Sequence, residues 1–138
     1  MTQINAYLNF NGNCREAMTF YKDCLGGELT IQTVEGTPME THCPTAMLQQ
    51  IMHSSLVKDG ILLMASDMRA PGTEFIQGNN MSLSLNCSSE EEINDFYSRL
   101  SSGGKIFDSL KPQFWGDIAG FFTDKFGTRW MLNYHKNN

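Results

Sequence analysis

A chain of 138 residues, with 41% hydrophobic and 18% charged residues, is long enough to form one domain or two small modules that share a core. Its formal net charge of -5 and the absence of any run of Lys and Arg argue against nucleic acid or an anionic membrane as a partner. No apolar stretch approaches the ~20 residues of a membrane span, and no signal peptide is evident. The four cysteines have no CxxC spacing, so we expect reduced thiols in a cytoplasmic protein.

The first predicted element is a strand over residues 5–10, because apolar and polar residues alternate there. A helix follows, and we expect Asn13 and Glu16 to form a capping box at its start. Gly26-Gly27 supplies the C-terminal stop of this helix. The apolar residues of the helix recur with a period of about 3.6. They form the stripe Ala17, Phe20, Tyr21, Cys24 and Leu25.

Three extended stretches follow this helix in the first half of the chain. They are predicted at Glu28–Glu35, Ala46–Val57 and Ile61–Asp67. Asp59-Gly60 is a signal for a two-residue hairpin turn between the last two stretches. The longest connection, around Glu35–Pro44, is a predicted loop.

The second half of the chain repeats this order. Phe20-Tyr21 recurs 76 residues later as Phe96-Tyr97, and the Gly-Gly pair recurs 77 residues later. Residues 5–11, "NAYLNFN", align with residues 80–86, "NMSLSLN", at an offset of 75. Each half is therefore predicted to be β-α-β-β-β. A duplicated unit of this kind buries its apolar face by packing against its neighbour.

The second copy contains the same local signals as the first. Its strand has an apolar face, its helix has an acidic first turn favoured by the helix dipole, and a Gly-Gly pair ends the helix. We predict an inward face of Met81, Leu83 and Leu85, a cap at Ser88 or Ser89 with Glu92, a helix stripe of Ile93, Phe96, Tyr97 and Leu100, and extended stretches at Lys105–Leu110, Ala119–Thr123 and Arg129–His135.

Three stretches carry a resemblance to a known family: "FNGNCREAMTFYKDCLGGEL", "IMHSSLVKDGILLMASD" and "QFWGDIAGFFTDKFGTRWML". With these stretches in this order, the chain resembles the glyoxalase/bleomycin-resistance/extradiol-dioxygenase (vicinal oxygen chelate) superfamily, and more narrowly its PhnB-like branch. The resemblance implies an α+β fold, with one glyoxalase-like domain over 1–138 made of two βαβββ modules at about 1–70 and 78–138. These modules are expected to form a curved mixed sheet around a cavity, and such proteins commonly pair as homodimers.

The resemblance implies that the usual site of this superfamily holds a divalent metal, which acts as a Lewis acid on a substrate with adjacent oxygens, whereas the drug-binding members use a hydrophobic cavity without a metal. The resemblance places the ligands on the first and last strand of each module, and the repeat puts these positions at Asn5, Met64, Asn80 and Met131. A thioether suits Cu(I) rather than a hard divalent ion, and a neutral amide oxygen is a weak ligand. We therefore predict no metal. We also predict no nucleotide cofactor, because no glycine-rich nucleotide motif occurs.

A cavity between the two sheets would then be lined by amide, hydroxyl and thioether groups. Such a lining suits an uncharged or aromatic small organic ligand held by a few hydrogen bonds. The alternative is that side chains and water fill the interior. The candidate ligand-pocket residues are Asn5, Tyr7, His53, Met64, Ser66, Asn80, Ser82, Trp115 and Met131, with Ser84 and Asn133 beside them.

Several single residues allow more than one interpretation. His53 either serves the pocket or is hydrogen-bonded structure, and Trp115 either walls the cavity or closes the interface between the modules. Cys14 follows the cap residue at a helix N-terminus, where backbone N–H groups favour a thiolate of lowered pKa; the alternative, which we favour, is a small packed cysteine. Asp67 ends a strand and is expected to stabilise the loop that follows. His135 is assigned no role.

Three functions are consistent with these observations. The first is a metal-free small-molecule binding or sequestering protein. The second is a metal-dependent lyase, transferase or dioxygenase that uses unconventional ligands such as His42 or His53. The third is a protein without a ligand, such as an interaction module. Metal affinity separates the first two functions, and the third predicts that no compound raises thermal stability.

Overall fold

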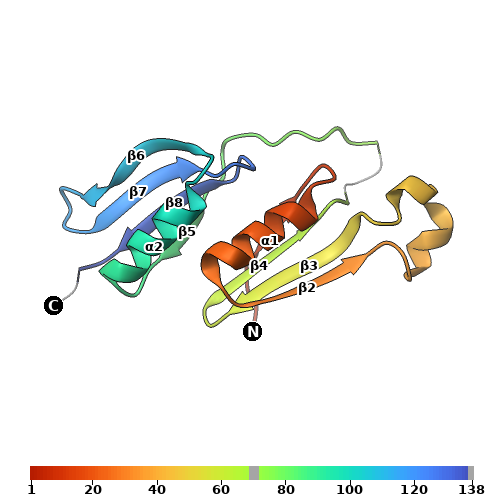
Figure 1. The fold of residues 1–138 in the computed structure, drawn as a ribbon, viewed down its shortest axis with the longest axis horizontal. Helices are drawn as coiled ribbons and strands as arrows, with labels where there is room; N and C mark the ends of the chain where they lie inside the picture. Colours follow the sequence, from red (N-terminus) through yellow and green to blue (C-terminus); the bar gives the residue numbers. More distant parts are fainter. Residues whose placement is uncertain (69–71, 137–138) are drawn as a thin grey trace. The chain divides into compact units, whose positions relative to one another are not determined.

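The computed structural model describes residues 1–68 and 72–136. The chain forms two compact units, residues 1–76 and 77–138. Each unit consists of a four-stranded mixed sheet and one α-helix (Figure 1). The fold is therefore α+β with two βαβββ modules, which confirms the order of elements predicted from the sequence. In the described part of the chain, no helix has the length and apolar character needed to cross a membrane.

The first unit has the strand order β1-β4-β3-β2. Its elements are β1 (Ala6–Asn9), α1 (Cys14–Leu25), β2 (Glu28–Thr33), β3 (Ile51–Lys58) and β4 (Ile61–Ser66). β1 is parallel to β4, whereas the other pairs are antiparallel. The predicted turn at Asp59-Gly60 joins β3 to β4. Asp59 adopts a φ of 45° there, a conformation that Asp tolerates better than most residues.

The second unit repeats this topology with the order β5-β8-β7-β6, and β5 is parallel to β8. Its elements are β5 (Leu83–Asn86), α2 (Glu90–Leu100), β6 (Lys105–Pro112), β7 (Ile118–Thr123) and β8 (Arg129–Tyr134). The edge strand β6 is irregular, because its register with β7 shifts between Ile106 and Asp108 and again between Asp108 and Lys111. Irregularities of this kind bend a strand and redirect its side chains.

The long connection between β2 and β3 is partly helical. It contains the 3₁₀ helices η1 (Pro38–His42) and η2 (Thr45–Met47). β3 therefore begins at Ile51 and not at Ala46, which corrects the predicted strand. A short apolar run does not by itself distinguish the start of a strand from a helical turn.

Each helix buries its apolar stripe against its own sheet. α1 packs on β2, β3 and β4, and α2 packs mainly on β8. Burying side chains of this size contributes ~1.5–3 kcal/mol each, so apolar contact is the main attachment of helix to sheet. The buried residues are Cys14, Ala17, Met18, Tyr21, Cys24 and Leu25 in α1, and Ile93, Phe96 and Leu100 in α2.

The first strands of the two copies align differently from the sequence prediction. Tyr7 pairs with Met64 in the first unit, and Ser84 pairs with Met131 in the second. Tyr7 therefore corresponds to Ser84, at an offset of 77 rather than the predicted 75. The position that corresponds to Asn5 is accordingly Ser82 and not Asn80.

The aromatic pairs of the two helices are also not equivalent. Tyr21, the second ring of its pair, is fully buried, whereas in the other helix it is Phe96, the first ring, that is buried. The β5–α2 connection is shorter than the β1–α1 connection. Similar residue types therefore recur one or two positions away from the structurally equivalent ones.

Asp67 is a buried carboxylate that connects three segments of the first unit, and it is only 5% exposed. Its Oδ1 accepts hydrogen bonds from the backbone N–H groups of Gly12 and Cys14, each at 3.0 Å. Its Oδ2 accepts from the backbone N–H of Ile51 at 2.9 Å. The predicted cap, Asn13, makes no side-chain capping bond. We had expected Asp67 to stabilise the loop after β4. The structure shows instead that it fixes the start of α1.

In the second unit a buried carboxylate holds the β7–β8 turn. Asp124 is 3% exposed. Its Oδ1 accepts hydrogen bonds from the backbone N–H groups of Phe126 and Thr128 at 2.8 and 3.1 Å. Its Oδ2 accepts from the indole N–H of Trp130 at 2.8 Å. This carboxylate therefore joins the turn to a core side chain of β8.

The start of α2 is stabilised by residues of its own first turn. Ser89 Oγ accepts a hydrogen bond from the backbone N–H of Glu92 at 3.0 Å, and Glu92 Oε1 accepts from the backbone N–H of Ser88 at 2.8 Å. This reciprocal arrangement confirms the predicted cap.

We predict that Asp67→Asn lowers the free energy of unfolding by about 1–3 kcal/mol, because the amide nitrogen cannot accept a hydrogen bond and leaves a buried backbone N–H unpaired. Urea denaturation measures this change. Asp59→Asn is the matched control, since Asp59 is an exposed turn residue and Asn tolerates its positive φ. Equal stability of the Asp67→Asn protein and the wild type would contradict the assigned role.

Candidate functional site

We call the face of each sheet opposite its helix the open face. Side chains alternate between the two faces of a strand, and Leu63 and Ala65 are buried on the helix side of β4. Leu62 and Met64 therefore belong to the open face of the first unit. The pairing of the strands extends this face across the sheet to include Tyr7, Asn9, Thr30, Gln32, His53, Ser55, Val57, Leu62, Met64 and Ser66.

Tyr7 and His53 form a hydrogen-bonded pair on this open face. Tyr7 Oη lies 3.1 Å from His53 Nδ1, and the two ring centroids are 5.8 Å apart. The residues come from β1 and β3, which flank β4, and Met64 of β4 pairs directly with Tyr7. Tyr7 is 44% exposed and His53 is exposed. The structure thus brings three predicted site residues together: a phenol, an imidazole and a thioether.

The open face of the second unit has a different composition. Ser84 pairs with Met131, and Asn133 follows two residues along β8. Trp130 and Leu132 alternate with these residues and are buried on the helix side. The face therefore presents a hydroxyl, a thioether and an amide, in agreement with the residue types predicted for it.

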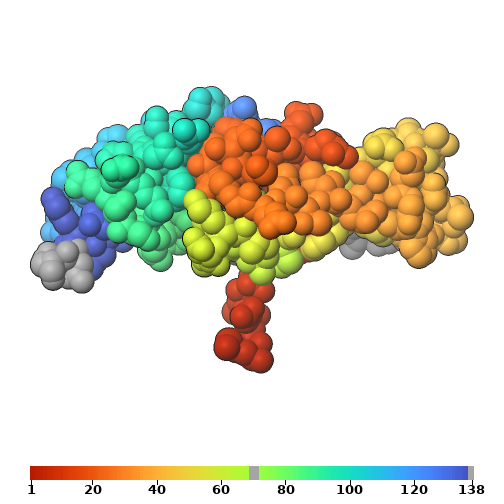
Figure 2. All heavy atoms as spheres, turned by 60° about the horizontal axis from the view of Figure 1, so that its bottom comes forward, coloured from red at the N-terminus to blue at the C-terminus, as the bar shows by residue number. Residues whose placement is uncertain are grey.

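Four predicted pocket residues lie elsewhere, and a fifth, Ser66, is on the open face but buried. Asn5 precedes β1, in an exposed N-terminal segment that projects from its unit (Figure 2). Asn80 and Ser82 are exposed and precede β5. Trp115 is 48% exposed in the turn between β6 and β7. Ser66 is 2% exposed, and its hydroxyl accepts a hydrogen bond from a backbone N–H of the next loop at 3.2 Å. In the sequence, the alternation of apolar and polar residues continues beyond the ends of β1 and β5. This is why Asn5, Asn80 and Ser82 were predicted to belong to these strands.

A histidine to which the sequence analysis gave no role is held by a carboxylate at the end of β8. Asp117 Oδ1 lies 2.6 Å from His135 Nδ1, and Oδ2 accepts a hydrogen bond from Asn133 Nδ2 at 3.0 Å. These bonds, that of His135 first, hold the pKa of Asp117 below its usual value. The sequence offered one signal for this site: side chains alternate along a strand, so Asn133 and His135 fall on the same face.

The donor atoms at the predicted metal-ligand positions do not fit a hard divalent ion. Met64 lies beside Tyr7, and Met131 lies beside Ser84, so each row offers a thioether next to a hydroxyl. Within residues 1–68 and 72–136, no three His, Cys, Asp or Glu side chains are grouped so that they could hold a metal ion. His42, the other histidine considered as a ligand, is exposed in η1.

Cys14 is fully buried, which confirms the packed cysteine and contradicts the alternative of a lowered pKa. Burial raises the pKa of its thiol to about 11, although the Ser54 hydroxyl, 3.6 Å from Sγ, acts in the opposite direction. The Asp67 carboxylate, which accepts the backbone N–H of Cys14, raises the pKa further. A helix N-terminus therefore does not produce a reactive thiolate here. All four cysteines are free thiols, as predicted.

The family model described as "Glyoxalase/Bleomycin resistance protein/Dioxygenase superfamily" matches residues 3–132. The chain therefore belongs to this superfamily. Protein YjdN of Escherichia coli (strain K12) is 31% identical to it over 142 residues, and the match covers 96% of this chain and 95% of YjdN.

Two solved structures share both the fold and recognisable sequence. Protein PA1353 from Pseudomonas aeruginosa is 38% identical, with a TM-score of 0.86 and coverage of 99% of this chain and 100% of PA1353. A PhnB protein from Bacillus cereus, described as a putative 3-demethylubiquinone-9 3-methyltransferase, is 26% identical, with a TM-score of 0.73 and coverage of 96% and 99%. These similarities confirm the PhnB-like resemblance, whereas the methyltransferase description belongs to the Bacillus cereus protein.

We predict that the protein loses stability as the pH rises above about 9. Burial raises the pKa of Cys14 to about 11 and that of Cys87 to about 12, so both thiols stay protonated in the folded chain after the unfolded chain has begun to lose these protons. Their contribution is fully present below pH 9 and is lost as the pH rises through the folded-state values.

Urea denaturation in reductant at pH 8, 9, 10 and 10.5 measures this loss. The loss should be smaller in Cys14→Ala, while Cys43→Ala, a substitution in the connection between β2 and β3, controls for removal of a thiol elsewhere. A pH profile of Cys14→Ala identical to that of the wild type would show that Cys14 does not contribute.

Proposed function

We propose that this protein binds a small organic molecule on the open faces of its sheets and does so without a divalent metal. The observation that carries the proposal is the Tyr7–His53 pair beside Met64. A phenol and an imidazole supply directional hydrogen bonds, and the thioether supplies an adaptable apolar surface. A small number of polar groups within an apolar surround is the usual composition of a ligand site.

Exposed apolar side chains on the same face support this proposal. Val57 is 49% exposed and Leu62 is 38% exposed. Their strands place them in one row of the open face, because Val57 pairs with Leu62. Removing apolar surface from water is favourable, so an uncharged or aromatic ligand that covers this row gains affinity.

The proposal extends to pairing and location. The superfamily resemblance supports a homodimer, and an exposed apolar sheet face suits association as well as ligand binding. Free thiols support a reducing compartment such as the cytoplasm. Light scattering of the purified chain tests the pairing.

We predict that compounds from a neutral aromatic library raise the melting temperature equally with and without EDTA. A ligand at 100 times its Kd adds about 2.7 kcal/mol to the stability of the state that it binds. Parallel titrations with Mn²⁺, Ni²⁺, Zn²⁺ and Co²⁺ should leave the melting temperature unchanged. Tight stoichiometric metal binding would instead favour the metal-dependent lyase, transferase or dioxygenase, and His42 and His53 would become the ligands to substitute.

The same stabilisation should weaken when the hydrogen-bonded pair is altered. Tyr7→Phe keeps the ring but removes the hydroxyl that contacts His53, and we expect the affinity for a library ligand to fall about fivefold, the equivalent of one hydrogen bond. Tyr134→Phe removes the same group from the helix side of the second unit and serves as the matched control. Unchanged affinity in Tyr7→Phe and in Tyr7→Ala would place the ligand elsewhere.

A further inference from the structure

The geometry points to an oxyanion site on the open face of the second unit, formed by Lys105, Phe107 and Arg129, which takes the acidic group of a small organic acid. This inference rests on the proposed small-molecule binding and adds the charge class of the ligand. It also changes the expectation from the sequence, which favoured an uncharged ligand.

The three residues meet at one end of the sheet. Thr123 of β7 pairs with Lys105 on one side and with Arg129 on the other. Arg129 alternates with the buried Trp130, so this row of side chains lies on the open face. Phe107 lies in the first register shift of β6. Lys105 Nζ is 5.3 Å and Arg129 Cζ is 5.4 Å from the centroid of its ring.

Both cations keep their N–H groups available to a ligand. Neither Lys105 nor Arg129 makes an ion pair or a side-chain hydrogen bond with any residue of 1–68 and 72–136. Their contacts are with the ring of Phe107. A cation within about 6 Å of a ring centroid is attracted by the π electrons, and this contact positions the charge without using its donors.

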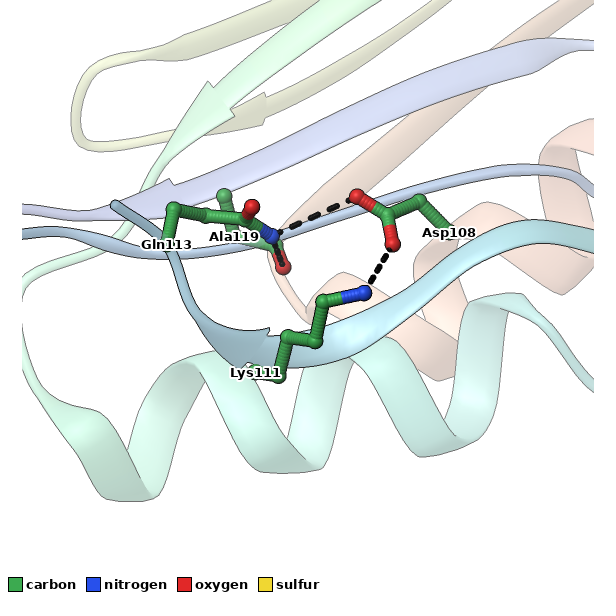
Figure 3. A network of polar contacts seen from close by, with 4 residues as sticks. All are labelled: Asp108, Lys111, Gln113 and Ala119. Carbon is green, nitrogen blue, oxygen red and sulfur yellow. Dashed lines mark hydrogen bonds and ion pairs between the residues drawn. The ribbon is translucent and has the colours of Figure 1, made fainter. Parts of the chain in front are cut away.

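The negative charge of Asp108, the residue after Phe107, is already neutralised by Lys111. Lys111 Nζ lies 2.5 Å from Asp108 Oδ1, and Gln113 Nε2 donates to Asp108 Oδ2 at 3.4 Å and to the carbonyl oxygen of Ala119 at 3.0 Å (Figure 3). The bond from Lys111 is the main reason that the pKa of Asp108 is lowered. Lys105 and Arg129 therefore remain a locally positive site in a chain of net charge -5.

These groups define the class of ligand. Guanidinium and ammonium groups recognise the oxygens of carboxylates and phosphates. Phe107 is 52% exposed, so its ring offers apolar surface beside the two charges. An oxyanion attached to an apolar or aromatic body matches both features. Carboxylic acids and phosphate esters share this chemistry.

The test is an NMR titration of the full chain with phenyl phosphate, phenylacetate, phenylacetamide and inorganic phosphate. We expect the better of the two acids to bind about tenfold more tightly than the neutral amide and to shift the backbone amide signals of Phe107 and Arg129. Its affinity should fall as the salt concentration rises, since exposed charges are screened. The tighter acid identifies phosphate or carboxylate as the preferred group.

Substitution separates this site from the proposed function. The double variant Lys105→Met with Arg129→Met should lose about tenfold in affinity for the acids and keep its affinity for phenylacetamide. Lys22→Met is the matched control, because Lys22 is an exposed lysine of α1 and belongs to the first unit. The control should bind all four compounds as the wild type does.

Two results would overturn the inference and leave the proposed function standing. One is equal affinity for phenylacetamide and the acids. The other is equal affinity for inorganic phosphate and phenyl phosphate, because the ring of Phe107 would then contribute nothing. A protein that binds neither these acids nor any neutral compound of the stability screen contradicts both the acid site and the proposed function.

Discussion

The buried carboxylate of Asp67 is the interaction on which the first unit depends. It accepts hydrogen bonds from three backbone N–H groups: one in the β1–α1 loop, one at the first residue of α1 and one at the first residue of β3. An apolar side chain at this position would leave each of them unpaired in the interior. Asp67 directly follows β4, the strand that pairs in parallel with β1. The hydrogen bonds of Asp67 therefore hold the end of β4 next to the end of β1, and with it the register that puts Tyr7 beside Met64 on the open face.

The two copies keep one topology but present different chemistry. The first open face centres on the Tyr7–His53 pair and on exposed apolar side chains. The second carries Ser84 and Met131, with Lys105 and Arg129 around Phe107 at one end and a His135–Asp117 pair at the other. Because the helices and the inner faces of the sheets carry the core, the residues of the open faces can differ between the two units without loss of the core.

The parts of the structure that the sequence predicts are those encoded by near neighbours. Alternation located the strands, the 3.6-residue period located the helices, and Asp59-Gly60 located a turn. The function of Asp67 could not be predicted, because its partners lie 16 to 55 residues away in sequence. Burial of Cys14 outweighs its place at a helix start, and contact between His135 and Asp117 depends on the pairing of β7 with β8. Such features require the register of the strands, which alternation alone leaves uncertain by one or two residues.

The different capping of the two helices has a consequence for the growing polypeptide. α2 finds its cap in Ser89 and Glu92, which leave the ribosome together with its first turn. α1 is complete long before Asp67, 53 residues after Cys14, has been synthesised. The earlier helix must therefore wait for the last strand of its unit, whereas the later helix is capped as soon as it emerges. The start of α1 is thus completed only at the end of the first unit, although still before α2 is synthesised.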